Sequence, residues 1–335
     1  MKIVNIPIEP LEERYSIQWD KWFRNEFNKA CIDTETVYGD TAITGVKHGS
    51  FLDVIETNFY KTSQLMKIME IITHYDDKDP LILFFHDLWF PGLINIAYIR
   101  DGLGLKNLKI CGCLHAGSYD EYDFLYKSGM NCWARWFESG ICAIVDKIFV
   151  ATQFHKAMIM ENRLVPDDHS ITVTGFPIYD EFSKPMCKTN LIIFPHRLDD
   201  EKLPVLFDEF SQYSEFKTRF KWLKTKEFCK TKQEFYEVLN KACIAISFAK
   251  QETWGIAMQE AVLCGCFPIV PNRLSYTEMY GDCFKYDDLN QAKMMIINLT
   301  MNPPFDELKT LQQSILKKGA AAIPSMIREI KKLVK

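Results

Sequence analysis

Two glutamates, Glu252 and Glu260, stand eight residues apart around the start of a predicted helix. Residues 243–248 form an apolar run of strand length, and apolar residues recur at helical spacing in 255–264. Gly265 follows, where the end of a helix needs a residue that tolerates positive φ. The order is therefore strand, loop and helix, with Glu252 in the loop and Glu260 in the helix.

This arrangement suits a ligand that carries both phosphates and hydroxyl groups. The N-terminus of a helix offers free backbone N–H groups and a partial positive charge, which bind anions such as a diphosphate. The two carboxylates can accept hydrogen bonds from the hydroxyls of a ribose and of a second sugar. A nucleotide sugar has all of these groups, and we expect its diphosphate at the backbone of Thr253, Trp254, Gly255 and Ile256.

The simpler interpretation is that both glutamates are solvated charges on an ordinary helix. Glu260 argues against it, because its neighbours Met258 and Ala261 belong to a helix that is apolar enough to be buried. A buried carboxylate needs a partner. The sequence therefore favours a binding role for the pair.

Two cations, Arg197 and Lys202, lie on the loop that follows the apolar run 190–194 and leads into another predicted helix. A guanidinium offers a fork of donors and an ammonium a point charge, and both bind phosphate at a helix entrance. The acids between them, residues 199–201, can instead pair with both cations in a solvated turn. The two glutamates downstream favour the phosphate interpretation.

The composition is that of a globular protein, with 47% hydrophobic and 25% charged residues among 335. This length suits two domains of about 150 residues each. The formal net charge of −4 gives no overall basic field, so tight non-specific binding of nucleic acid is not indicated. This charge does not exclude a local basic cleft. The 11 cysteines include no C-x-x-C pair, and the sequence has no signal peptide pattern and no apolar run of about 20 residues. We expect free thiols in a soluble, cytoplasmic protein without a membrane span.

Predicted strands alternate with predicted helices along the first half of the chain. After an opening strand at the N-terminus, the strands are 31–37, 81–85, 108–114, 147–151 and 171–174, and the helices include 16–28, 61–74 and 153–163. The pattern predicts a parallel sheet with functional residues at the carboxyl ends of its strands. The stretch 175–177 is the expected domain boundary, and 185–190 the expected linker.

Two histidines follow predicted strands. His86 and Asp87 come after 81–85, and His115 comes after 108–114. A lone histidine at a strand end is often a structural hydrogen-bonding residue, and that alternative stays open for both. We favour His115, because Ala116 and Gly117 after it allow a backbone to approach a ligand closely. The candidates on this acceptor side are Arg14, His86, Asp87, Gly117 and Ser118.

Several blocks of the sequence resemble known glycosyltransferases. The Glu252–Glu260 spacing resembles the E-x7-E element of retaining GT-B enzymes of the family 4 type. FPHRLDDEK, SFAKQETWGIAMQEAVLCGCFPIVP and Tyr276-Thr277-Glu278 resemble the tRNA-queuosine mannosyltransferase family over about 90 residues. The first half, with PIEPLEERYS, FHDLWFPG and LHAGSYD, resembles glycosyltransferases of bacterial viruses (bacteriophages), some of which modify hydroxymethylated DNA bases. Its first loop departs from the glycine-rich turn of many GT-B enzymes and carries Glu9, Glu12 and Glu13 instead.

The resemblance implies an α/β protein of the GT-B fold, with two Rossmann-like domains whose parallel sheets face each other across a cleft. We expect an acceptor-side domain at 1–180, a donor domain at 190–305, and C-terminal helices at 306–335 that pack back on the first domain. It also implies roles: Glu252 contacts the sugar, Glu260 the ribose, and Glu278 matches a later glutamate of the family. The residues expected to take part in catalysis are Glu252, His115, Arg197 and Lys202.

The sequence thus favours a retaining glycosyltransferase that moves a hexose or pentose from a nucleotide sugar to a hydroxyl without a metal or other cofactor. The leaving phosphate would be stabilised by preorganised charges. We expect the acceptor to be a hydroxymethylated base in DNA, which would place a viral enzyme in the cytoplasm of its host. A tRNA nucleoside, a small molecule and a polysaccharide are alternatives. Candidates for acceptor contacts are Arg14, Trp89, Arg100, Lys127 and Arg135.

Two other hypotheses stay open. A GT-A enzyme would use the acidic run 120–123 with a divalent metal, but such enzymes lack a late E-x7-E element. A protein that binds nucleotide sugars or nucleic acid without catalysis would keep the same donor residues. The sugar, the nucleotide and the oligomeric state cannot be read from the sequence.

Overall fold

The computed structural model divides into two compact units. Unit 1 comprises Met1–Pro177 together with Ala321–Lys335, and unit 2 comprises Ile178–Ala320. The structure describes residues 1–11, 14–41, 53–166, 170–184 and 186–334. Glu12 and Glu13 of the first loop and Pro185 of the expected linker lie outside the described residues.

Unit 1 contains a six-stranded, fully parallel sheet in the order β2-β1-β3-β4-β5-β6. The strands are β1 (Lys2–Ile6), β2 (Asp33–Thr36), β3 (Leu81–Phe85), β4 (Leu108–Cys113), β5 (Lys147–Val150) and β6 (Ile171–Val173). All six were predicted from the apolar runs, within two residues at most ends. The parallel order follows from the helix that separates each strand from the next.

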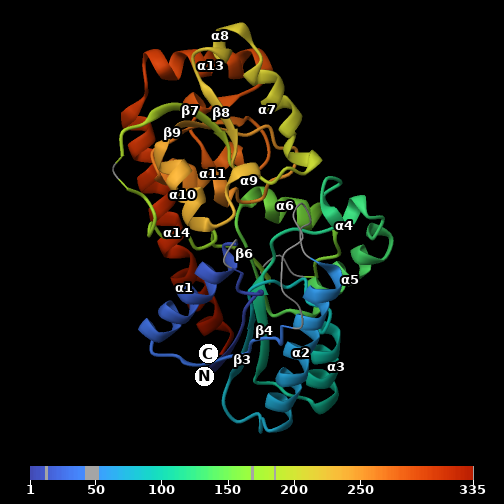
Figure 1. Cartoon of the computed structure of the whole chain (residues 1–335). Helices are drawn as coiled ribbons and strands as arrows, with labels where there is room; N and C mark the ends of the chain where they lie inside the picture. The colour runs from blue at the N-terminus through green and yellow to red at the C-terminus, as the bar shows by residue number, and fades with distance from the viewer. Residues whose placement is uncertain (12–13, 42–52, 167–169, 185, 335) are drawn as a thin grey trace. The chain divides into compact units, whose positions relative to one another are not determined.

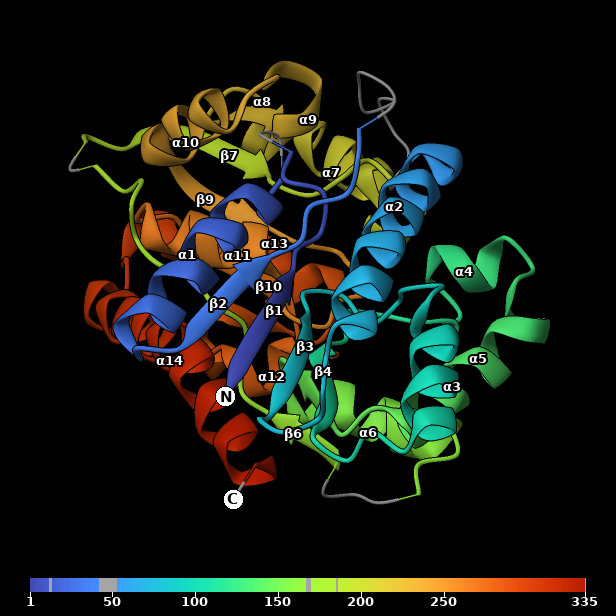
Figure 2. The same cartoon turned by 90° about the horizontal axis from the view of Figure 1, so that it is seen from below.

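Helices cover both faces of this sheet. They are α1 (Ser16–Lys29), α2 (Val54–Thr73), α3 (Leu93–Leu103), α4 (Phe124–Lys127), α5 (Asn131–Ile144) and α6 (Gln153–Asn162). Helix α1 lies on the opposite side of β1, β3 and β4 from α2 and α3 (Figures 1 and 2). Successive residues of β3 serve the two faces, because Phe84 meets Phe23 of α1 at a ring distance of 5.1 Å while Leu83 shares a core with Ile68 of α2.

Unit 2 contains a five-stranded parallel sheet in the order β11-β10-β9-β7-β8. The strands are β7 (Thr189–Phe194), β8 (Lys221–Lys224), β9 (Ala242–Ile246), β10 (Phe267–Pro271) and β11 (Lys285–Tyr286). Helix α11 (Ile256–Leu263) connects β9 to β10, as the apolar spacing predicts. The other helices are α7 (Pro204–Ser211), α8 (Ser214–Lys217), α9 (Thr225–Phe228), α10 (Lys232–Lys241), α12 (Tyr276–Met279) and α13 (Leu289–Met301).

One long helix, α14 (Phe305–Leu333), ends the chain and belongs to both units. Its residues from Ala321 onward form part of unit 1, where Glu329 lies 4.0 Å from Lys147 of β5. The expected domain ranges 1–180, 190–305 and 306–335 stay predictions of domain extent. No helix in the described ranges is long and apolar enough to cross a membrane.

Each sheet has a point at which the strand order reverses. In unit 2, β7 lies between β8 and β9, so the connections after β7 and β9 leave the sheet on opposite sides. In unit 1, β1 lies between β2 and β3 in the same way. Ligands of open α/β sheets bind outside the carboxyl ends of the strands at such a point. The loops that follow β7 and β9 are therefore the first place to look for a site in unit 2.

Candidate functional site

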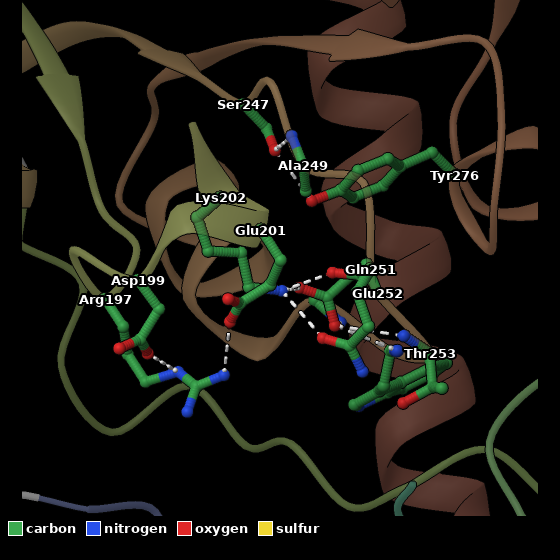
Figure 3. Close-up of polar contacts among 12 residues, drawn as sticks. Arg197, Asp199, Glu201, Lys202, Ser247, Ala249, Gln251, Glu252, Thr253 and Tyr276 are labelled. Carbon is green, nitrogen blue, oxygen red and sulfur yellow. Dashed lines mark hydrogen bonds and ion pairs between the residues drawn. The ribbon is translucent and has the colours of Figure 1, made fainter. Parts of the chain in front are cut away.

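The loop after β7 holds Arg197 between two carboxylates. It passes through a short 3-10 helix, Asp200–Lys202, before α7 begins at Pro204. The Arg197 guanidinium donates to Glu201 Oε1 at 3.0 Å and lies 3.2 Å from Asp199 (Figure 3). Its side chain is still 38% exposed. The local pairing that the sequence left open is therefore present, and the exposed guanidinium can also reach a ligand.

Lys202 is buried and joins the loop after β7 to the loop after β9. Its ammonium donates to the main-chain oxygen of Gln251, to the Gln251 side chain at 3.2 Å and to Glu252 Oε2 at 3.3 Å (Figure 3). The N–H of Lys250 donates to the main-chain oxygen of Glu201 at 2.8 Å, which ties the same two loops together. The residues that the sequence pairs by motif are thus brought together at the reversal point of the sheet.

The Glu252 carboxylate organises the start of α11. Its Oε1 accepts the backbone N–H groups of Thr253 at 3.1 Å, Trp254 at 3.3 Å and Gly255 at 2.7 Å. Gly255, at φ 66°, adopts the left-handed conformation that favours glycine. These N–H groups, which the sequence assigns to a diphosphate, are occupied by Glu252 here. A phosphate at this terminus would have to share them with the carboxylate.

The charge of Glu252 is stabilised despite its burial. Burial raises the pKa of the Glu252 carboxyl group. The nearby Lys202 ammonium and the N–H of Gly255 lower this pKa, and the net result is a pKa below the usual value of 4.5. The glutamate is therefore an acceptor-only group at neutral pH, as a partner for sugar hydroxyls must be.

The loop after β9 that carries Glu252, here called the glutamate loop, packs against Tyr276 of α12. The Tyr276 ring is fully buried, its hydroxyl lies 3.0 Å from Ser247 Oγ, and a Cβ on Gly255 would lie 3.3 Å from its ring (Figure 3). Glu278, which matches a later family glutamate, is exposed on the same short helix. The buried tyrosine fixes the loop, and Glu278 stays available to solvent.

Glu260 is buried in α11, as its apolar surroundings predict, and its partners come from α10. Lys232 donates to Glu260 Oε1 at 2.6 Å, and the Tyr236 hydroxyl donates to the same oxygen at 2.8 Å. Oε2 accepts no hydrogen bond from the residues that the structure describes. The sequence did not reveal Lys232 and Tyr236, although their spacing of four places both on one face of a helix.

His115 lies in an aromatic setting at the end of β4 in unit 1. Its Nε2 lies 2.7 Å from the main-chain oxygen of His86 and its Nδ1 lies 3.3 Å from the Tyr15 hydroxyl. The rings of Trp19 and Phe176 are both 4.9 Å away. Burial lowers the pKa of His115. The imidazole is partly exposed, but both of its nitrogens have partners within unit 1.

His86 is a core residue. Its side chain has no exposed surface, its Nε2 lies 2.8 Å from Asn5 Oδ1, and burial lowers the pKa of the imidazole to about 3. These contacts favour the structural alternative for His86, and its acceptor contact stays a prediction. Asp87 next to it accepts the N–H of Trp89 at 3.1 Å and lies 3.5 Å from Lys61.

Gly117 and Ser118 belong to a buried network around Glu138 of α5. Glu138 accepts the Ser118 N–H at 2.7 Å and its hydroxyl at 2.9 Å, and it forms a 2.6 Å ion pair with Arg163. A Cβ on Gly117 would lie 2.7 Å from Glu138 Oε1. The glycine makes room for this carboxylate, and the expected role of Gly117 and Ser118 at the acceptor stays a prediction.

The other acceptor candidates differ in how far they reach solvent. Arg100 is held inside unit 1 by Asp146 at 3.2 Å, and the Trp89 indole donates to Glu138 at 3.1 Å. Lys127 and Arg135 are exposed, and Arg14 is partly exposed on the first loop. Lys127 and Arg135 are therefore the most exposed of these candidates.

The acidic run of the GT-A hypothesis serves the backbone. Asp120 accepts the N–H of Tyr122, and Asp123 caps α4 by accepting the N–H of Leu125, both at 2.9 Å. Within the described ranges, no three His, Cys, Asp or Glu side chains are grouped so that they could hold a metal ion. All eleven cysteines are free, and five of them are buried: Cys111, Cys113, Cys142, Cys264 and Cys266.

Comparison with known proteins supports the fold. No protein-family profile matches the chain. A tRNA-queuosine alpha-mannosyltransferase of Drosophila melanogaster is 30% identical in an alignment of 136 residues that covers 33% of this chain and 36% of that protein, so the match spans about a third of the relative's length.

Two solved structures match nearly the whole chain. Sucrose-phosphate synthase from Thermosynechococcus elongatus matches with a TM-score of 0.66 and 12% identity over 99% of both chains. The catalytic domain of starch synthase IV from Arabidopsis thaliana, bound to ADP and acarbose, matches with a TM-score of 0.62 and 10% identity over 100% of this chain and 98% of that one. With its two parallel sheets of Rossmann type, the chain has the GT-B glycosyltransferase fold.

Proposed function

We propose that the protein is a glycosyltransferase that moves a sugar from a nucleotide-sugar donor to a hydroxyl group of an acceptor. The observation that carries this proposal is the Lys202–Glu252 ion pair of 3.3 Å at the reversal point of the unit 2 sheet. It sets a phosphate-binding cation beside a carboxylate that can accept sugar hydroxyls, and both residues come from the blocks that resemble glycosyltransferases.

The donor would be bound through its three parts. Arg197 and Lys202 would bind the diphosphate, together with the backbone of Thr253–Ile256. Glu252 would accept hydroxyls of the transferred sugar. The second oxygen of Glu260 would accept a ribose hydroxyl, because the described protein groups that bond to this carboxylate use Oε1.

The reaction would proceed with retention at the anomeric carbon. The bond from this carbon to the phosphate oxygen breaks, the acceptor oxygen bonds to the same face, and the acceptor proton passes to the leaving phosphate. Arg197 and Lys202 would stabilise the charge that develops on that phosphate, which is preorganised electrostatic catalysis. Since these cations neutralise the leaving group, we propose that no metal is required.

A donor screen tests this function. The protein would be incubated with uridine, guanosine, adenosine and cytidine diphosphate sugars, and binding would be followed by thermal shift and release of the nucleoside diphosphate by mass spectrometry. We expect one nucleotide class to stabilise the protein, with turnover that persists in a metal chelator. Loss of turnover in the chelator would favour the metal-dependent alternative, and stabilisation without turnover with any acceptor would favour a binding protein.

We propose a nucleic acid as the acceptor, with a hydroxymethylated DNA base favoured. Two tryptophans of α5 are exposed, Trp133 by 50% and Trp136 by 60%, and the guanidinium of Arg135 lies 4.7 Å from the Trp136 ring. Exposed aromatic rings beside cations bind unpaired bases by stacking, and an enzyme that modifies a base in a duplex must first extrude it. The resemblance of the first half to viral enzymes favours DNA, whereas the match to the Drosophila mannosyltransferase favours tRNA.

The acceptor assay uses DNA with 5-hydroxymethylpyrimidine, unmodified DNA and bulk tRNA, each digested to nucleosides after reaction with the donor. A sugar mass increment on the hydroxymethylated base supports the DNA proposal, and one on tRNA alone reverses the preference. Replacing Trp136 by Ala should weaken binding of the acceptor by roughly tenfold, since stacking of one base contributes about 1–3 kcal/mol. Phe228→Ala, which removes an aromatic ring that is 63% exposed in unit 2, is the matched control.

A further inference from the structure

His196 is a buried histidine at the end of β7 whose Nε2 lacks a partner in the described part of the chain. The residue is 4% exposed and packs against Phe194 with a ring distance of 5.2 Å. Nε2 is fully buried and bonds to none of the residues that the structure describes. Buried polar groups in native proteins are nearly always hydrogen-bonded, so this unpartnered nitrogen calls for an explanation.

The surroundings of His196 are those of the donor site. It precedes Arg197 in the chain, and its electrostatic neighbours are Lys202, Glu252 and Arg197. Burial, strengthened by the two cations, lowers the pKa of His196 to about 3. The imidazole is therefore neutral at physiological pH, with one nitrogen that donates a hydrogen bond and one that accepts.

A comparison with His86 shows what a structural histidine looks like in this chain. His86 also follows a parallel strand and is also buried, and its Nδ1 has no partner among the described residues, but Asn5 on the neighbouring strand lies 2.8 Å from its Nε2. Nothing in the described part of unit 2 offers His196 such a bond. The partner of His196 is then a group that arrives with a ligand.

We propose that His196 binds the terminal phosphate of the nucleoside diphosphate, between the cations that hold the diphosphate and the glutamate that holds the sugar. This inference rests on the proposed function and adds a contact to it. A neutral imidazole would donate its N–H to a phosphate oxygen without transferring a proton. Because that phosphate is the leaving group, the bond would strengthen as the sugar departs and negative charge builds up.

The test separates binding from folding. His196→Phe keeps a flat ring of similar size and removes the unpartnered Nε2, so the variant should unfold at the same temperature as the wild type or higher. Its Kd for the diphosphate should rise at least about tenfold, as the loss of a hydrogen bond to a charged group predicts. His196→Asn, which retains a donor near the Nδ1 position, should bind with an intermediate Kd and serves if the Phe variant does not fold.

The probes are UDP, GDP, ADP and CDP with the corresponding monophosphates, measured by calorimetry. For the diphosphate that the wild type binds, we expect the Kd to rise in His196→Phe while the Kd of its monophosphate stays within about twofold. His155→Phe is the control, because it removes a buried histidine of unit 1 whose Nε2 lies 2.6 Å from the Tyr119 hydroxyl. It should lower the unfolding temperature and leave the diphosphate Kd unchanged.

Three results would overturn the inference. An unchanged diphosphate Kd in His196→Phe would show that the ring does not meet the phosphate, and the proposed function would survive. Equal losses for the monophosphate and the diphosphate would place the contact on the nucleoside and not on the terminal phosphate. A wild-type protein that binds none of the four diphosphates would refute the proposed function and this inference together.

Discussion

The polar groups at the carboxyl ends of the two sheets are used in different ways. In unit 1, buried polar side chains bond to one another: His86 with Asn5, and Glu138 with Ser118 and Arg163. In unit 2, the buried Lys202 pairs with the partly buried Glu252, and Arg197 remains 38% exposed beside them. Both regions occupy the strand ends at which α/β proteins bind ligands.

The difference shows that position at a strand end does not by itself mark a functional residue. A closed set such as Glu138, Ser118 and Arg163 satisfies its own hydrogen bonds and therefore stabilises the fold. An open set keeps exposed charge, as the 38% exposed Arg197 does, and we propose that a ligand completes it. We expect substitutions in unit 1 to act mainly on stability and those in unit 2 mainly on binding.

The largest effect on stability is expected for Glu138→Gln. The amide would leave the Arg163 guanidinium buried without its counter-charge, and breaking such a pair costs about 3–5 kcal/mol in the free energy of unfolding. Urea unfolding followed by circular dichroism measures it. Glu121→Gln, at an exposed position three residues before α4 begins, would be nearly neutral. A loss below about 1 kcal/mol for Glu138→Gln would mean that the network is not closed as described.

The largest effect on turnover is expected for Glu252→Gln. The amide keeps the shape of the side chain but replaces one acceptor oxygen by a donor, at a cost of about 1.5–3 kcal/mol for a hydrogen bond to a charged group. Turnover with a verified donor should fall roughly 10- to 100-fold. Glu209→Gln, at an exposed glutamate of α7 that has no expected role in the site, is the control. Wild-type turnover in Glu252→Gln would remove this glutamate from the site.

The same variant should change the response to acid. Because the pKa of Glu252 in the folded protein lies below its usual 4.5, its charge stabilises the fold above pH 4.5, and this contribution is lost as the pH falls through the lower, folded-state pKa. Unfolding temperatures measured from pH 7 downward should therefore fall more steeply below pH 4.5 in the wild type than in Glu252→Gln. Parallel curves would contradict the depressed pKa.

The fold could be predicted largely from local patterns. The strand Leu81–Phe85 is a continuous apolar run bounded by turn residues, and such a run predicts a buried strand from the sequence alone. Helix α2 starts at Val54 and not near residue 61, because Asp53 caps it by accepting the N–H groups of Ile55 and Glu56. Helices α8 and α9 were not predicted, since they have only four residues each and show no periodicity.

The site could be predicted only where a motif spans it. Spacing predicted Arg197, Lys202, Glu252 and Glu260 as site residues, and the structure brings the loops that carry Lys202 and Glu252 together. Their protein partners were missed: Lys232 lies 28 residues from Glu260. A single sequence carries no signal for a contact over that distance. The strand-end histidines were ambiguous for the same reason, since the Asn5 that fixes His86 is 81 residues away.

The next comparison is between Lys202 and Arg197, the two cations of the candidate site in unit 2. Lys202→Ala would leave the Gln251 and Glu252 oxygens without their donor and should cost about 1–3 kcal/mol in unfolding free energy, in addition to weaker diphosphate binding. Arg197→Ala should also weaken binding of the diphosphate. The exposed ion pairs of Arg197 contribute only about 0–1 kcal/mol to stability. Calorimetry with the diphosphate and urea unfolding separate the two effects. Equal losses of stability would show that Lys202 is no more structural than Arg197.

The smallest effect is expected from a pair of glycines, one in each unit. Gly255 and Gly104 have the same left-handed backbone, with φ of 66° and 67°, and alanine there costs about 1–2 kcal/mol. A Cβ on Gly104 meets nothing within 4 Å, whereas one on Gly255 lies 3.3 Å from the Tyr276 ring. Gly104→Ala should therefore lower only the free energy of unfolding.

Gly255→Ala should lower that free energy by a similar or slightly larger amount and also raise the Kd of the diphosphate severalfold, because it displaces the backbone N–H that lies 2.7 Å from Glu252. Measuring stability and binding for both variants isolates this second effect, since the backbone strain is matched. If both variants bind the diphosphate like the wild type, the turn at Gly255 serves the fold alone. The glutamate loop would then tolerate displacement, and the division of roles between the two units would be weaker than the hydrogen bonds indicate.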